Sequence, residues 1–317
     1  MTAEGGADML NILWSILPIF VLIVLGNLLR RNGIPSIEFW NLNDKLVYWV
    51  LFPSLLFYKT STTDLAGGII GPLAAIILTG LVAAVAVSLI LGLALGFNRP
   101  QATSILQGSA RHNTFIALAI AERLFGADGL AVAALCTAVL IPPTNVLIIS
   151  LMNIMLHQGG GGSLWAPVAR DLARNPLILS VALGMGVQYI GIGEIPVVHE
   201  ATSMLGRAAL PIVLLAVGAN IRLHEMKASV APIALATAVK FLIFPAAAWA
   251  MCWQLGITGV PAYVITIFAV MPMPPSSFTI AREMGGDAPL AASMITLQTL
   301  LSLITVPVSL VIAQKLF

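Results

Sequence analysis

The sequence is poor in charge. Only 9% of its 317 residues are Asp, Glu, Lys or Arg, whereas 59% are hydrophobic and the mean hydropathy is +1.00. About a quarter of the residues of a soluble domain are usually charged, so most of this surface must face lipid. The runs Leu10–Leu29, Ile69–Leu95 and Leu130–Met152 each reach the roughly 20 apolar residues that a membrane-spanning helix requires. The sequence therefore predicts an all-α polytopic membrane protein.

Other absences exclude further classes of protein. The two cysteines, Cys136 and Cys252, lie in apolar segments, so neither a disulfide framework nor a metal site is predicted. The net charge of +2 is too small and too scattered for nucleic-acid binding. No P-loop, GxSxG motif, paired metal motif or ATPase domain occurs. We therefore expect no enzyme activity and no cofactor.

The apolar pattern predicts about ten transmembrane helices. Their predicted ranges are Leu10–Leu29, Asn41–Tyr58, Ile69–Leu95, Ala102–Phe125, Leu130–Leu156, Asn175–Ile192, Val197–Ile221, Ala228–Leu255, Ala262–Met284 and Ala288–Leu316.

The two halves of the chain resemble each other. GPLAAIILTGLVAAVAVSLILGLALG (71–96) aligns with APIALATAVKFLIFPAAAWAMCWQLG (231–256), FPSLLF (52–57) with LPIVLL (210–215), and AERLFGADGLA (121–131) with AREMGGDAPLA (281–291). The offset is about 160 residues throughout, which indicates one duplicated unit. We expect a first five-helix repeat at residues 1–156, a glycine-rich cytoplasmic linker at 157–174 and a second repeat at 175–317. Because five is odd, the second repeat must be inverted, as in many secondary transporters.

The basic residues predict the orientation in the membrane. With the N-terminus outside, nine basic residues lie in cytoplasmic loops and helix ends and three lie outside. The nine are Arg30, Arg31, Lys45, Arg99, Arg170, Arg174, Arg222, Lys227 and Arg282; the three are Lys59, Arg123 and Lys315. Cytoplasmic loops are rich in Lys and Arg, so we expect a multi-pass protein of the plasma or inner membrane with both termini extracytoplasmic.

The fourth and ninth predicted helices each contain a stretch that a continuous membrane helix does not favour. MPMPPSSF (271–278) holds three prolines, each of which removes a backbone donor and clashes with the preceding turn. SARHNTF (109–115) places charged and polar residues within an apolar span, and the repeat offset brings His112 opposite Pro272. Such breaks are tolerated only where protein or a water-filled cavity surrounds them. We therefore expect two broken crossover helices at a binding site.

Two broken helices that cross at the midplane would present half-helix N-termini, each with about half a positive charge, and would attract carboxylates. Asn113 can donate and accept hydrogen bonds, Arg111 adds positive charge, and His112 can change protonation near neutral pH. The candidate substrate-binding residues are Arg111, His112, Asn113, Thr114, Pro272, Met273, Pro274, Ser276 and Ser277. The alternatives are an Asn113 that only joins helices, an Arg111 that offsets the C-terminal end of a preceding half-helix, and a neutral His112 packed in a helix seam.

The two broken stretches resemble the crossover helices of the auxin efflux carrier family, which comprises the plant carriers and their bacterial relatives. The resemblance rests on HNTFIALAIAERLFG (112–126) and MPMPPSSFTIAREM (271–284), with FPSLLF, RNPLILSVALGMG, LPIVLLAVGANI and AVKFLIFPAAA in other helices, and spans nearly the whole chain. It implies the ten-helix fold shared with bile-acid and sodium/proton transporters, usually a homodimer. In that fold the first, second, sixth and seventh helices form a scaffold and the other six a moving domain. The short glycine-rich loop is similar to the bacterial members, which are associated with malate, malonate and similar anions.

Two further basic residues lie within predicted helices. Lys240, at the centre of its span, is a candidate substitute for the coupling cation that related folds hold near the crossover, where it would stabilise exposed backbone carbonyls. The alternative is an ion pair with Glu122 or Glu283. For Arg207, close to Pro211, we expect a structural role.

The function that we expect is secondary transport of a small organic anion by an elevator or rocking motion. The expected substrates are mono- and dicarboxylates, with auxin-like molecules among the candidates. The alternatives are a sodium-coupled symporter of the bile-acid type and a membrane sensor that uses the same fold without transport. The expected partners are the anion, the lipid bilayer and a second copy of the chain.

Overall fold

The computed structural model describes residues 9–63, 68–156, 174–221 and 230–317, and within these ranges it is helical and contains no strand. Six helical segments are long and apolar enough to cross a membrane: Met9–Arg31, Ile70–Ala94, Arg99–Leu156, Val198–Ala219, Val230–Leu255 and Ala288–Leu316. Two shorter apolar helices are Pro176–Ile190 and Gly259–Ala269. The all-α polytopic class is confirmed, and the number of ten crossings stays a prediction.

The helices occupy the predicted segments. They are α1 (Met9–Arg31), α2 (Ile37–Leu46), α3 (Phe52–Thr62), α4 (Ile70–Ala94), α5 (Arg99–Ala110), α6 (Thr114–Leu156), α8 (Pro176–Ile190), α9 (Val198–Ala219), α10 (Val230–Ala238), α11 (Phe244–Leu255), α12 (Gly259–Ala269), α13 (Ser276–Met284) and α14 (Ala288–Leu316). Gly126, with a φ of 63°, interrupts the helical conformation inside α6. A positive φ suits glycine, and this kink lies between two segments that the sequence predicts as separate spans.

Proline explains two turns of π-helix. η1 (Val47–Leu51) joins α2 to α3 directly before Phe52 and Pro53, and η3 (Val239–Ile243) joins α10 to α11 directly before Phe244 and Pro245. Proline has no backbone N–H and its ring clashes with the preceding turn. A wider turn accommodates the ring without ending the helix. The segments α2–η1–α3 and α10–η3–α11 therefore each form one continuous helix.

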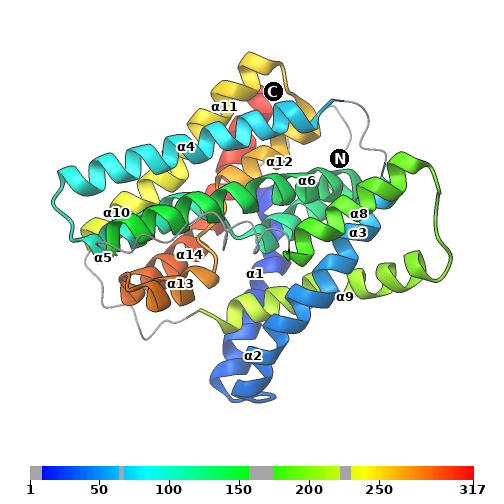
Figure 1. Ribbon diagram of the computed structural model, residues 1–317, viewed down its shortest axis with the longest axis horizontal. Helices are drawn as coiled ribbons and strands as arrows, with labels where there is room; N and C mark the ends of the chain where they lie inside the picture. The colour runs from blue at the N-terminus through cyan, green and yellow to red at the C-terminus, as the bar shows by residue number, and fades with distance from the viewer. Residues whose placement is uncertain (1–8, 64–67, 157–173, 222–229) are drawn as a thin grey trace.

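The helices pack in two groups. In one group α3 packs on α8 and α9, and α1 on α9; in the other, α4 packs on α11 and α5, and α12 on α6 and α14. Figure 1 places α4 and α11 at one edge of the molecule and α2 at the opposite edge. In the first group α1 and α9 approach so closely that a Cβ atom on Gly26 or Gly218 would overlap the backbone of the other helix. Small residues allow such close packing in lipid, where the hydrophobic effect does not drive helices together.

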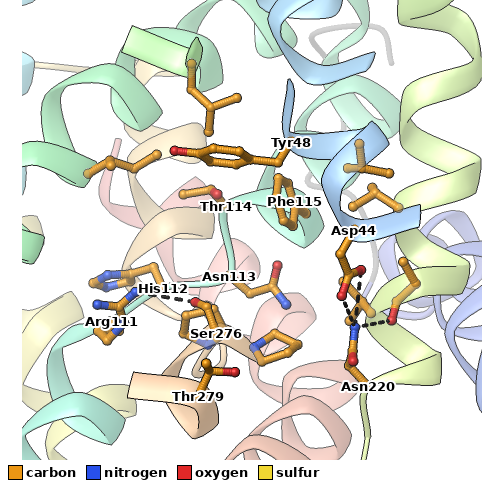
Figure 2. Close-up of a pocket in the computed structure, with 18 of the residues that line it drawn as sticks. Asp44, Tyr48, Arg111, His112, Asn113, Thr114, Phe115, Asn220, Ser276 and Thr279 are labelled. Atoms are coloured by element: carbon orange, nitrogen blue, oxygen red, sulfur yellow. Dashed lines mark hydrogen bonds between the residues drawn. The ribbon is translucent and has the colours of Figure 1, made fainter. Parts of the chain in front are cut away.

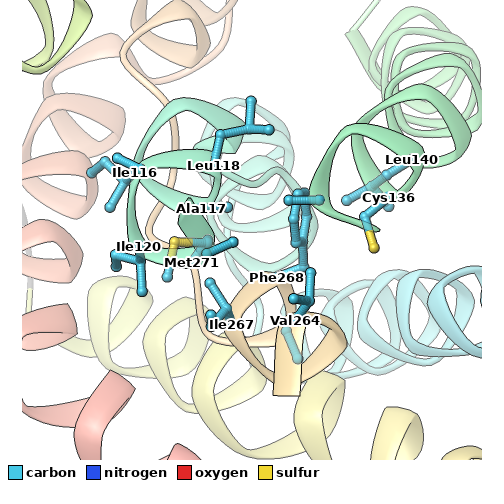
Figure 3. Close-up of a cluster of buried hydrophobic side chains, with 14 of the residues drawn as sticks. Ile116, Ala117, Leu118, Ile120, Cys136, Leu140, Val264, Ile267, Phe268 and Met271 are labelled. Atoms are coloured by element: carbon cyan, nitrogen blue, oxygen red, sulfur yellow. The ribbon is translucent and has the colours of Figure 1, made fainter. Parts of the chain in front are cut away.

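The second group has an apolar core around the start of α6. Ile116 and Ile120 of α6 pack with Ile267 and Phe268 of α12 and with Met271, all buried (Figure 3). This core holds the chain directly after one helix break against the chain directly before the other. The two breaks are therefore fixed to each other by packing.

The predicted division into repeats at 1–156 and 175–317 stays a prediction. The predicted glycine-rich linker at 157–174 lies outside the described residues, apart from Arg174.

Candidate substrate cavity at the helix crossing

Two helix interruptions meet at the predicted place. α5 ends at Ala110 and α6 begins at Thr114; α12 ends at Ala269 and α13 begins at Ser276. The backbone N–H of Asn113 donates to the carbonyl of Pro272 over 2.8 Å. This bond joins the two non-helical stretches and satisfies backbone groups that would otherwise lie unpaired inside the membrane.

Two side chains from other helices stabilise the crossing. Lys240 Nζ, from η3, donates to the carbonyl of Arg111 over 2.7 Å, at the C-terminal end of α5. Gln298 of α14 accepts from the N–H of Met273 over 2.9 Å and donates to the carbonyl of Gly108 over 3.1 Å. Both side chains are fully buried. They are partners for backbone atoms that the breaks leave without helical bonds.

Asn113 caps α6. Its Oδ1 accepts from the N–H of Ile116 over 3.3 Å, three residues along, as an N-cap side chain does. Its Nδ2 is buried and has no protein partner. Because the oxygen is used by the cap, the amide presents a donor at the positive end of the helix dipole.

A cavity of about 700 Å³ opens beside this crossing. Arg111, His112, Asn113 and Thr114 line it from the first break, and Pro274 and Ser276 from the second (Figure 2). Six of the nine predicted binding residues are therefore brought together around one space. The cavity is closed on one side by α8 and α9 of the first group with α2 and η1, which pack on α9, and on the other by α6 of the second group with α13, which packs on α14.

Arg111 is held between two elements of the cavity wall. Its Nη1 donates to Asn145 Oδ1 over 3.1 Å and its Nη2 to Ser276 Oγ over 3.4 Å, and its Nε is buried without a protein partner. The guanidinium therefore joins the second half of α6 to the start of α13 and keeps donor capacity for an anion.

His112 lies beside Arg111 with its ring against Phe244, the centroids 4.5 Å apart and the planes at 70°. Both ring nitrogens are buried and have no protein partner. Whether its protonation changes near neutral pH or it stays neutral in the helix seam remains open between the two expectations from the sequence.

Four predicted site residues lie outside the cavity lining. Pro272 and Lys240 hold the crossing through their bonds to Asn113 and Arg111. Met273 is buried in a second apolar cluster that includes Ile105 and Met294. Ser277 is buried and its hydroxyl has no protein partner.

The far side of the cavity carries polar residues that sequence reasoning missed. Asn220 Nδ2 donates to Asp44 Oδ2 over 3.0 Å, and Arg30 Nη1 donates to Asn220 Oδ1 over 3.1 Å. Asp44 and Asn220 line the side that faces Arg111 across the cavity (Figure 2). Asn145 was missed as well, although it directly follows Pro142, Pro143 and Thr144 in an apolar span and is therefore conspicuous in the sequence.

Within the described ranges, no three His, Cys, Asp or Glu residues are placed to hold a metal ion.

Comparison with known proteins finds similarity to membrane transporters. Residues 163–310 match the family model described as membrane transport protein. The chain is 24% identical over 298 residues to an uncharacterized transporter of Methanothermobacter thermautotrophicus, with 92% of this chain and 95% of the relative covered. It is 22% identical, with the same coverage, to an uncharacterized transporter of Methanocaldococcus jannaschii. The chain is therefore similar to membrane transport proteins, over residues 163–310 for the family model and over nearly its whole length for the two archaeal transporters.

Proposed function

We propose that the protein is a secondary transporter of small organic anions and that the cavity at the helix crossing is its substrate site. The observation that carries the proposal is the donor set at the crossing. The N-termini of α6 and α13 meet at the cavity, Asn113 Nδ2 is a buried donor without a protein partner, and Arg111 adds a positive charge. Helix N-termini and an arginine fork both favour a carboxylate.

The proposed motion is a displacement of one helix group past the other. The cavity lies between α2, η1, α8 and α9 on one side and the crossing on the other. In the orientation that the basic residues predict, Lys45 and Arg174 lie on the cytoplasmic side, so the cavity is open to the cytoplasm. The inverted five-helix repeats and the homodimer belong to the same proposal, and repeat symmetry would supply the second, outward-open state.

A panel of carboxylates tests the proposal on purified protein. A ligand that binds only the folded state raises the melting temperature, by about 5 °C for a chain of this size near one hundred times its Kd. We expect at least one mono- or dicarboxylate to stabilise the native protein and the Asn113→Ala variant to lose this shift. Asn153→Ala is the matched control, because Asn153 lies in the same helix and outside the cavity lining. A panel without any shift, or an equal shift in Asn113→Ala, would contradict the assignment.

A further inference from the structure

A second cavity lies on the other side of the same helices. Its volume is about 530 Å³, and its lining includes Lys59, Glu122, Arg123 and Arg207. These side chains come from α3, α6 and α9. Of these, α6 and α9 also border the substrate cavity, and α3 directly follows η1, which borders it too. Three cations against one carboxylate give the lining a positive balance, which attracts anions most strongly inside a low-dielectric wall.

The two cavities are lined by different faces of the same helices, α6 and α9. Along α9, Val213 lines the first cavity and its neighbour Leu214 the second; along α6, Phe115 lines the first and Ala119 the second. Four residues of helix span roughly 6 Å. Phe52, fully buried, packs against Phe115 with ring centroids 4.5 Å apart. Apolar side chains, Phe52 and Phe115 among them, therefore form the barrier beside the first cavity.

Arg207 places a charged side chain in the lining of the second cavity. It lies near the middle of α9, which is apolar and long enough to span a membrane, and its side chain is exposed and lines the cavity. A charged side chain in the middle of a span is costly unless it faces a water-filled space or a partner. The structural role expected from the sequence does not explain this exposure.

The other basic residues are placed around the same space. Arg123 Nε donates to the carbonyl of Ser15 on α1 over 3.2 Å, so its guanidinium bridges the two helix groups at the cavity. Lys59 Nζ lies 5.8 Å from the centroid of the Tyr58 ring.

We propose that the second cavity is an anion-binding vestibule for small carboxylates on the opposite side of the barrier from the crossing, with Arg123 and Arg207 as its anion-attracting residues. Its place on a transport route rests on the proposed function, whereas its affinity for anions does not.

Thiol modification tests the vestibule without a known substrate. Ser203 lines the cavity, and the native Cys136 and Cys252 are buried, so a Ser203→Cys variant adds one accessible thiol. In purified full-length protein, we compare its rate of reaction with a sulfonate-bearing methanethiosulfonate and with a trimethylammonium-bearing one. The native chain gives the background.

We expect the ratio of anionic to cationic rates to exceed that of a free thiol by about tenfold. Adding Arg123→Gln and Arg207→Gln to the Ser203→Cys chain should return the ratio close to that of the free thiol. Adding Arg282→Gln instead, a change outside both cavity linings, should leave the ratio high. Malonate should slow both reagents relative to chloride at equal ionic strength.

Three results would each overturn the vestibule. They are an anionic-to-cationic rate ratio equal to that of the free thiol, a high ratio that survives loss of both arginines, and modification that malonate does not slow. Asn113→Ala separates the two proposals. If it abolishes stabilisation by carboxylates but leaves the rate ratio high, the crossing and the vestibule are independent anion sites. If no carboxylate stabilises the native chain while the ratio is high and malonate protects, the proposed substrate site fails and the vestibule stands.

Discussion

Replacing Arg111 by Gln is expected to lower the affinity of the cavity for a carboxylate by about 10- to 150-fold, because a hydrogen bond to a charged group contributes about 1.5–3 kcal/mol. Its guanidinium is already oriented by Asn145 and Ser276, so little side-chain entropy is lost when an anion binds. Titration of the melting temperature with the best carboxylate of the panel measures the change.

Two further variants sharpen this prediction. Arg111→Lys keeps the charge but has no planar fork, so we expect an intermediate affinity. Arg282→Gln removes a basic residue of α13 that lies outside the cavity lining and should bind as the native chain does. Native affinity in Arg111→Gln would mean that the guanidinium only joins helices.

Replacing Lys240 by Met is expected to weaken carboxylate binding by about 5- to 150-fold, although Lys240 lies outside the cavity. The substitution removes the donor to the Arg111 carbonyl, and a buried acceptor without a partner costs about 1–3 kcal/mol. We expect the carbonyl to turn toward the cavity, which displaces the residues before α6. Binding of an anion would then have to return these residues to their native positions, which lowers the affinity.

Rescue distinguishes this positioning role from a general loss of packing. Lys240→Arg retains a donor and should recover part of the affinity, whereas Lys240→Met should not. Lys315→Met, at the exposed end of α14, is the matched control. If Lys240→Met binds carboxylates as tightly as the native chain, the bond to Arg111 does not hold the site together.

The breaks could be predicted because their causes are local. Pro272, Pro274 and Pro275 prevent a continuous helix whatever surrounds them, and polar residues such as Asn113 within an apolar span indicate a cavity. The structure places both breaks within a few residues of the prediction and joins them through Asn113 and Pro272. Lys240 was expected to stabilise backbone carbonyls near the crossing, and its bond to Arg111 has this geometry.

The remaining contacts depend on how distant segments pack. Gln298 bonds to Gly108, 190 residues away, and Asn220 bonds to Asp44, 176 residues away. A nearly uniform apolar sequence does not indicate which face of a helix meets which neighbour, since lipid and protein interior favour the same side chains. Asn145 and Arg207 stand out in the sequence as polar residues within apolar spans, but only the structure shows that they line cavities.

Counterflow in proteoliposomes tests the central claim most directly. Vesicles that contain the protein are loaded with the unlabelled carboxylate that gives the largest thermal shift, and uptake of the same labelled carboxylate is followed. We predict that native protein concentrates the label transiently above its external level, and that Asn113→Ala and Arg111→Gln do not. Uptake by native protein no faster than in protein-free vesicles, or counterflow that both variants retain, would contradict transport through the helix crossing.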